Sequence, residues 1–276
     1  MGPEPERYEM LRDIADPVLT FTDVSKRFDD GTVALAGVDL RVASGEFVSV
    51  VGPSGCGKST LLRIASGLSA ASGGTALAHT DKLGYVFQDP TLLPWRTVQA
   101  NVELFAELRG LPKDERRRRA DDAIRLVGLG EFARHHPRAL SGGMRMRVSL
   151  ARSLTLQPEL FLFDEPFGAL DEITRERLND ELLQLFLTQR FTALFVTHSV
   201  TEAVFMSTRV VVMSSRPGEV LGDFPVPFEY PRPPRLRFED DFAHVAGDVS
   251  ACLRGQRRRA AQLPRNQRPV GGIAHR

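Results

Sequence analysis

The chain has 276 residues and a formal net charge of +1, with 42% hydrophobic and 26% charged residues, as in ordinary globular domains. No apolar run approaches the roughly 20 residues that a membrane-spanning helix needs, and the first 20 residues lack the apolar segment of a secretory signal, so we expect neither a channel nor a secreted protein. Two cysteines exclude a disulfide framework or a cysteine-ligated metal cluster and favour a reducing compartment.

The first third of the chain predicts strands followed by a loop and a helix. Residues 1–17 are polar and form a leader, and apolar and polar residues then alternate over 18–24, as in a strand. A turn at 29–32 leads into a second strand. The valine-rich run at 47–52 is continuously apolar, which is typical of a strand inside a parallel sheet. It passes through a glycine-rich loop into a segment of helical periodicity that ends at Gly67.

Strands and helices alternate in the rest of the chain. A strand is predicted at 82–88, helices over 97–157, and buried strands at 160–166 and 192–198 with a helix after each. We expect a last strand at 209–213. This alternation predicts an α/β architecture with a mostly parallel sheet.

Beyond Pro225 the composition changes. The stretch that follows is rich in proline and arginine and is interpreted as a linker. A short amphipathic helix is predicted next, with one apolar face formed by Phe242, Val245, Val249 and Leu253. Residues 254–276 contain seven arginines and no acidic residue, so the rest of the chain has a net charge of −6. This tail is either an unstructured solubilising end or a segment attracted to anionic lipid.

The glycine-rich loop has the pattern of a phosphate-binding loop. G-P-S-G-C-G-K-S at 52–59 fits G-x-x-x-x-G-K-[ST], and it lies between a buried strand and a helix, as the motif requires. Glycines allow successive backbone N–H groups to face an anion, and the helix N-terminus adds its dipole. Lys58 supplies a charge for the β- and γ-phosphates and the Ser59 hydroxyl is suited to Mg²⁺.

Two carboxylates follow the strand at 160–166. Asp164 is placed to hold Mg²⁺, and Glu165 to accept the proton of an attacking water. The alternative is a pair of surface acids that cap a helix. His198 ends the next strand, and beside a phosphate loop and an acid pair we interpret it as a donor to the γ-phosphate rather than as a structural histidine.

A second anion-binding helix start is predicted in L-S-G-G-M at 140–144. Ser141 is a good N-cap, and Gly142 and Gly143 leave backbone N–H groups exposed. Since one nucleotide has one triphosphate, this second anion-binding helix start suits the nucleotide of a partner subunit. The alternative is a capped helix after a turn.

In this order the motifs resemble the ATP-binding subunit of ATP-binding-cassette (ABC) transporters. G-P-S-G-C-G-K-S-T is similar to the Walker A loop, L-S-G-G-M to the family's signature, L-F-L-F-D-E-P to Walker B, V-F-Q-D-P to the Q-loop and G-A-L-D to the D-loop. The resemblance implies a P-loop NTPase fold with a mostly parallel core sheet, a small antiparallel β region and an α-helical subdomain. It covers residues 18–222, divided into a core at 18–95 and 158–222 and a helical subdomain at about 96–157. Residues 223–276 would then form the linker, short helix and basic tail.

The resemblance also implies roles for individual residues in binding ATP and Mg²⁺. The catalytic residues would be Glu165, His198, Gln88 and Lys58, and the metal would be held by Ser59, Gln88 and Asp164. Nucleotide-binding residues would be Phe28 against the adenine, the loop residues Gly52, Pro53, Ser54, Gly55, Cys56, Gly57, Lys58, Ser59 and Thr60, and, from the other subunit, Ser141, Gly142 and Gly143.

The implied partners are a second copy of the chain, packed head to tail with Asp171 at the seam, and transmembrane permease subunits. The segment 89–96, which contains Trp95, would face the permease. An external solute-binding protein would act indirectly, no nucleic acid is expected, and the chain would lie peripherally on the cytoplasmic face of the plasma membrane.

A finer resemblance is to importers of the nitrate/sulfonate/taurine type, carried by Q-D-P-T-L-L-P-W-R-T-V, T-H-S-V-T-E-A-V and V-V-V-M-S-S-R-P-G. Three features depart from the family pattern: Met146 replaces a usual glutamine, Ser199 replaces a frequent aspartate, and 69–83 is short. The alternatives are a soluble cassette ATPase that is not coupled to transport and a module that binds ATP without cleaving it. The sequence does not indicate the transported solute.

Overall fold

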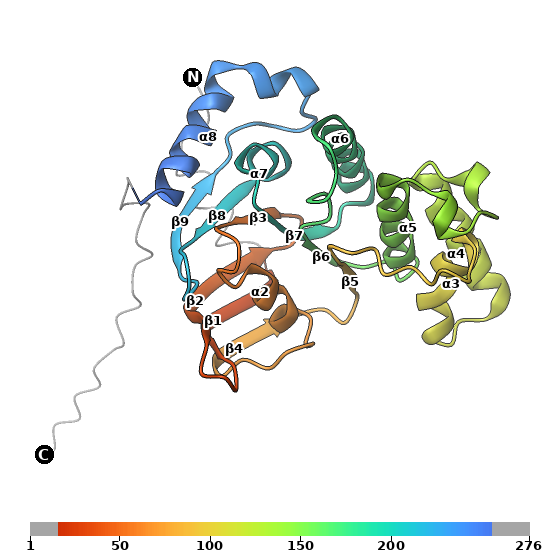
Figure 1. Ribbon diagram of the computed structural model, residues 1–276, viewed down its shortest axis with the longest axis horizontal. Helices are drawn as coiled ribbons and strands as arrows, with labels where there is room; N and C mark the ends of the chain where they lie inside the picture. The colour runs from red at the N-terminus through yellow and green to blue at the C-terminus, as the bar shows by residue number, and fades with distance from the viewer. Residues whose placement is uncertain (1–15, 256–276) are drawn as a thin grey trace, which may run out of the picture.

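A computed structural model describes residues 16–255 of the chain (Figure 1). The expected leader, up to residue 15, and the arginine-rich tail from residue 256 lie outside the described residues. Among the residues described, no helix is long and apolar enough to cross a bilayer.

The main sheet has six strands in the order β5-β6-β7-β3-β8-β9. Five of them are parallel: β3 (Phe47–Val51), β5 (Leu83–Val86), β6 (Leu160–Asp164), β7 (Thr192–Thr197) and β8 (Arg209–Met213). Every residue of β3, β6, β7 and β8 is buried, because the sheet is covered on both faces. The continuous apolar runs in the sequence therefore predicted these strands correctly.

A second, antiparallel sheet has the order β2-β1-β4. It consists of β1 (Pro17–Arg27), β2 (Val33–Ala43) and the short β4 (Gly73–Ala78). Helix α2 (Lys58–Ala65) packs between the two sheets: its Leu61 and Leu62 share a core with Val38 of β2 and Val50 of β3. The small antiparallel region expected before residue 83 is confirmed.

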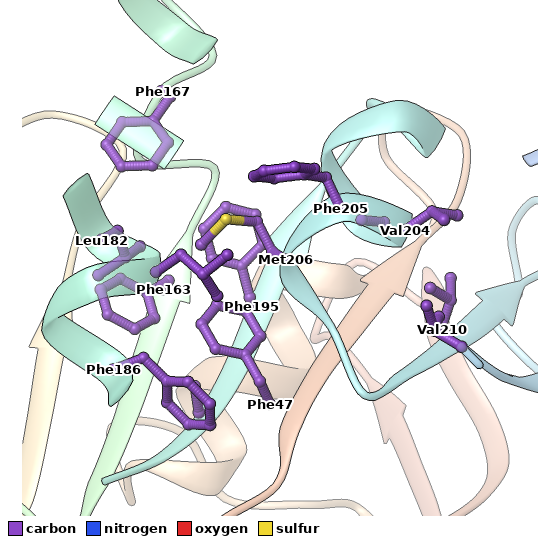
Figure 2. Close-up of a cluster of buried hydrophobic side chains, with 14 of the residues drawn as sticks. Phe47, Phe163, Phe167, Leu182, Phe186, Phe195, Val204, Phe205, Met206 and Val210 are labelled. Carbon is purple, nitrogen blue, oxygen red and sulfur yellow. The ribbon is translucent and has the colours of Figure 1, made fainter. Parts of the chain in front are cut away.

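The opposite face of the main sheet is covered by α6 (Glu172–Gln189), α7 (Val200–Met206) and α8 (Asp240–Leu253). Aromatic side chains fill this interface. Figure 2 shows Phe47 and Phe195 from the sheet pointing toward Phe163, Phe186 and neighbouring apolar side chains. The rings of Phe47 and Phe186 meet edge to face, with centroids 5.2 Å apart.

Three helices form a separate subdomain at one side of the molecule (Figure 1). They are α3 (Val98–Leu108), α4 (Lys113–Leu126) and α5 (Gly142–Leu154), with short 3₁₀ helices at Gly130–Phe132 and Pro137–Ala139 between α4 and α5. They enclose an apolar core of their own. The fully buried Asn101 fixes the entry to α3, because its Oδ1 accepts a hydrogen bond from Leu93 N at 2.7 Å and its Nδ2 donates to three backbone carbonyls.

The structure corrects two expectations for the C-terminal region. Strand β8 is not the last, because β9 (Val220–Pro225) pairs antiparallel with it. The stretch that follows is packed and is not a loose linker: Val226 and Arg232 are buried, and a 3₁₀ helix spans Pro234–Phe238. The amphipathic helix is confirmed as α8, which buries Phe242 and Val249.

Candidate nucleotide-binding site

The phosphate loop, residues 52–59, connects β3 to α2 as the sequence predicted. Gly55 and Gly57 have φ angles of 75° and 105°, a backbone conformation that favours glycine. A Cβ on Gly57 would lie 2.7 Å from the Ala34 carbonyl oxygen and from Leu35 Cδ2, so no side chain fits there. The loop therefore turns tightly enough for its N–H groups and the start of α2 to surround an anion.

Lys58, the first residue of α2, is buried and directed back over the loop. Its Nζ donates to the Gly52 carbonyl at 2.8 Å and the Pro53 carbonyl at 3.1 Å, and lies 3.5 Å from Glu165 Oε1. A phosphate in the loop would compete for the same N–H donors. The ammonium is thus already placed where phosphate charge would be.

Ser59 and Asp164 meet beside the loop, although 105 positions separate them in the chain. The Ser59 hydroxyl donates to Asp164 Oδ1 at 2.7 Å, and the Tyr85 hydroxyl donates to Oδ2 at 3.2 Å. Burial, reinforced by the charge of Asp164, raises the pKa of Tyr85, so this phenol stays protonated and remains a donor.

The sequence did not single out Tyr85 as a site residue. Only the register of β5 on β6, which sets Tyr85 opposite Leu162, brings it near Asp164. The sequence did contain one indication of a site residue: a tyrosine, with its polar hydroxyl, in an otherwise apolar strand.

Glu165 and His198 also form a pair. His198 Nδ1 lies 3.0 Å from Glu165 Oε2, and the Glu165 backbone N–H donates to the Val196 carbonyl at 2.9 Å. Glu165 has a φ of 45°, an uncommon value for a residue with a side chain. Backbone strain of this kind is often found at functional sites, and the Glu165 carboxylate lies beside both Lys58 and His198.

Gln88 and Phe28 lie outside this cluster of contacts. Gln88 follows β5 and is exposed, and no hydrogen bond within the described residues joins it to Ser59 or Asp164. Phe28 follows β1 in a turn, with 42% of its surface exposed and Lys26 Nζ 5.5 Å from its ring centroid. An exposed ring of this kind is available for stacking.

The signature residues lie apart from the phosphate loop of the same chain. Ser141 caps α5 as predicted, accepting a hydrogen bond from Met144 N at 3.3 Å. The start of α5 packs against the start of α6, because a Cβ on Gly142 would contact Leu170 and one on Gly143 would contact Thr174. Helix α5 belongs to the helical subdomain, whereas α2 lies between the sheets on the other side of the molecule (Figure 1).

Two departures from the family pattern have structural counterparts. Met146 is buried in the core that covers the main sheet, where it lines a cavity of about 450 Å³ between α5 and α6. Ser199 caps α7, accepting from Glu202 N at 3.2 Å, so serine supplies the cap that an aspartate would also supply.

Comparison with known proteins identifies the family. The model of the ABC transporter family matches residues 35–168. The aliphatic sulfonates import ATP-binding protein of Pseudomonas syringae pv. syringae (strain B728a) is 47% identical over 204 residues, which cover 73% of this chain and 83% of that protein. The nitrate import ATP-binding protein of Synechocystis sp. (strain PCC 6803) is 40% identical over 254 residues, which cover 86% and 96%.

The solved dimeric structure of a bacterial ABC transporter cassette matches with a TM-score of 0.68 and 33% identity, over 76% of this chain and all of that chain. The chain therefore belongs to the ABC transporter family, and the expected cassette fold is confirmed. It is an ATP-binding chain of this family, in which ATP hydrolysis is coupled to transport.

Proposed function

We propose that this chain hydrolyses ATP to energise an importer of a small anion or organic solute of the nitrate, sulfonate and taurine class. The observation that carries this proposal is the sequence identity of the chain to import ATP-binding proteins, 40% for nitrate and 47% for aliphatic sulfonates, over most of each chain. The substrate would be bound outside by a solute-binding protein and carried by a membrane permease, with this subunit peripheral on the cytoplasmic face.

The nucleotide would lie across α2 and the turn at Phe28. The exposed Phe28 ring would stack on the adenine, and the backbone N–H groups of residues 52–60 would hold the phosphates. Lys58 would exchange its bonds to the Gly52 and Pro53 carbonyls for the β- and γ-phosphate oxygens. This exchange preserves the number of bonds made by a buried ammonium.

The residues around Asp164 fit a magnesium ion. The hydroxyl of Ser59 and the carboxylate of Asp164 are hard oxygen donors, and they already lie 2.7 Å apart. With two oxygen ligands from the chain, the site suits a metal that takes its other ligands from phosphate and water. Gln88 would complete the set from the end of β5, and the ion would neutralise charge on the phosphates.

Glu165 is placed to act as the general base. Its carboxylate is held by Lys58 on one side and His198 on the other, near the end of the phosphate loop. Glu165 would take a proton from the attacking water as the new oxygen–phosphorus bond forms and the bond to ADP breaks. His198 would orient the carboxylate and donate to the γ-phosphate.

Replacement of the base tests this assignment. Glu165→Gln retains the size and one acceptor oxygen but accepts no proton, so we expect turnover to fall by at least about 100-fold with ATP binding retained. Steady-state hydrolysis and equilibrium binding of ATP measure the two effects. His79→Ala, on the exposed surface of the antiparallel sheet, serves as the control. Unchanged hydrolysis in Glu165→Gln would refute the assignment.

Reconstitution tests the transport function. The full chain, its permease and its solute-binding protein are placed in liposomes, and ATP hydrolysis is measured with nitrate, taurine or an alkyl sulfonate. We expect one of these solutes to stimulate hydrolysis. Hydrolysis that is indifferent to the permease and to all three solutes would favour an ATPase that is not coupled to this transport.

A further inference from the structure

Within the loop between β8 and β9 (residues 214–219), the segment 214–218 lies against the phosphate loop. Its sequence is S-S-R-P-G, and the roles assigned above leave it without a function. The end of this loop pairs with β2: Gly218 N donates to the Ala34 carbonyl at 2.9 Å, and Ala36 N donates to the Gly218 carbonyl at 3.1 Å. The β8–β9 loop is therefore fixed to the strand on which Gly57 also packs.

The β8–β9 loop packs closely against the phosphate loop. A Cβ on Gly218 would lie 2.1 Å from the Cys56 carbonyl oxygen, far inside contact distance. The β8–β9 loop is also braced internally, because the Ser214 hydroxyl donates to the Pro217 carbonyl at 2.7 Å and accepts from Glu219 N at 2.9 Å. A rigid support therefore lies directly behind the phosphate loop.

Arg216 adds a charged contact at the same place. Two nitrogens of its guanidinium, Nε and a terminal one, donate to the Gly55 carbonyl at 3.1 and 3.0 Å. This carbonyl belongs to the peptide unit that carries the Cys56 N–H, and in a trans peptide the two groups point in opposite directions. Cys56 N points across the loop, where it makes a long 3.3 Å bond to the Pro53 carbonyl.

We propose that Arg216 is a positioning residue for ATP, which holds the Gly55–Cys56 peptide with its N–H toward the bound phosphates. The guanidinium also polarises the peptide, because a cation on the carbonyl oxygen makes the N–H a stronger donor. The β8–β9 loop thus sets the phosphate affinity of a loop that lies more than 150 positions earlier in the chain. The inference depends on nucleotide binding at residues 52–59 and not on the identity of the transported solute.

The test compares Arg216→Ala and Arg216→Lys with the wild-type full-length chain. Dissociation constants for ATP and for inorganic tripolyphosphate are measured by displacement of a fluorescent ATP analogue, together with KM and kcat for hydrolysis. Arg125→Ala is the matched control, because the Arg125 side chain is 71% exposed and its hydrogen bonds within residues 16–255 go to its own helix, at Asp122 and the Asp121 carbonyl.

We expect Arg216→Ala to weaken binding of ATP and of tripolyphosphate equally, by about 5- to 10-fold, as for loss of a charge-assisted hydrogen bond. KM should rise by a similar factor while kcat stays within about twofold, since the variant loses ground-state and transition-state binding alike. Arg216→Lys should recover part of the affinity, because an ammonium can donate one bond to Gly55. Arg125→Ala should match the wild type.

Three results would overturn the proposal. Unchanged affinities in Arg216→Ala would show that the contact has no influence on the phosphate loop. Loss of ATP affinity with tripolyphosphate binding intact would mean that Arg216 touches the nucleoside instead. A lowered melting temperature in Arg216→Ala, with no recovery of affinity in Arg216→Lys, would indicate a structural role only.

Discussion

Glu202 is a carboxyl group in the protein interior, in the first turn of α7. Burial raises its pKa above the usual glutamate value. Hydrogen bonds with Thr197 and Asn179 and the charges of Arg175 and His198 act in the opposite direction, with smaller effect. Thr197 and Ser199, which flank His198, both hydrogen bond to Glu202, so this residue links the protein interior to the candidate site.

A raised pKa makes stability depend on pH in a definite direction. The folded protein holds the Glu202 proton more tightly than the unfolded chain does, so this contribution to stability is complete below the ordinary glutamate pKa and is lost as pH rises through the raised value. Glu202→Gln cannot titrate. We therefore expect the melting temperature of Glu202→Gln, relative to wild type, to be higher at pH 8 than at pH 5.

Thermal unfolding at several pH values measures this difference. Glu229→Gln, which changes an exposed glutamate outside the site, is the control. A difference between Glu202→Gln and wild type that stays constant from pH 5 to pH 8 would show that Glu202 does not titrate with folding in this range.

At the scale of elements, a buried arginine, Arg232, anchors the segment between β9 and α8. The guanidinium of Arg232 donates to the carbonyls of Val204, Phe205 and Ser207 at 2.8 to 3.0 Å, and to that of Phe228. The first three carbonyls lie at the C-terminal end of α7, where backbone carbonyls have no partner within the helix. Arg232 therefore caps the C-terminal end of α7 and joins the segment between β9 and α8 to the core.

Replacement of Arg232 should be costly. Arg232→Ala leaves several buried carbonyls without donors, so we expect a loss of about 3 kcal/mol in the free energy of unfolding. Urea denaturation of the full chain measures this loss. Arg235→Ala removes an exposed arginine three positions later and should change stability by less than about 0.5 kcal/mol. Equal effects of the two substitutions would contradict the proposed role.

The packing of this segment could not be predicted from the sequence, whereas the parallel sheet could. The valine- and phenylalanine-rich runs of β3, β6, β7 and β8 predicted the parallel sheet because burial on both faces requires apolar residues throughout. The stretch around Arg232 has the composition of a linker, and its burial depends on backbone carbonyls of α7 that no local pattern shows. A charge-rich composition therefore predicts an exposed segment only where the charged side chains have no hydrogen-bond partners elsewhere in the chain.

The candidate site divides in the same way. Motif spacing predicted that Lys58, Ser59, Asp164, Glu165 and His198 belong together, and the structure brings them into contact. Spacing could not find Tyr85 or Arg216, because their partners come from neighbouring strands and loops whose order depends on sheet topology. Gln88 was predicted from the family resemblance alone, and its metal contact stays a prediction.

At the scale of the whole molecule, the two helix starts that are predicted to bind anions lie on different parts of one chain. Helix α2 is packed between the two sheets, and α5 belongs to the helical subdomain (Figure 1). A head-to-tail dimer would bring the Ser141 end of α5 from one copy to Lys58 of the other. The solved bacterial cassette structure that this chain resembles is dimeric, and the head-to-tail arrangement is our prediction for this chain.

Mixing two inactive variants tests this arrangement. Lys58→Ala should abolish phosphate binding. Ser141→Asp should preserve the cap of α5, because aspartate caps as well as serine, while its carboxylate repels the γ-phosphate. In a head-to-tail dimer of one variant with the other, both defects fall in one site and the second site is intact. Random pairing should then restore about a quarter of the wild-type sites, measured by single-turnover hydrolysis of labelled ATP.

The matched control is a mixture of Lys58→Ala with Glu165→Gln. Both of these residues lie on the phosphate-loop side of the site, 3.5 Å apart in one chain, so every mixed dimer carries a defect in each site and no activity should return. Recovery in the Ser141→Asp mixture but not in the Glu165→Gln mixture requires that each site is built from two chains. If neither mixture hydrolyses ATP although dimers are present, the signature helix serves the nucleotide of its own chain.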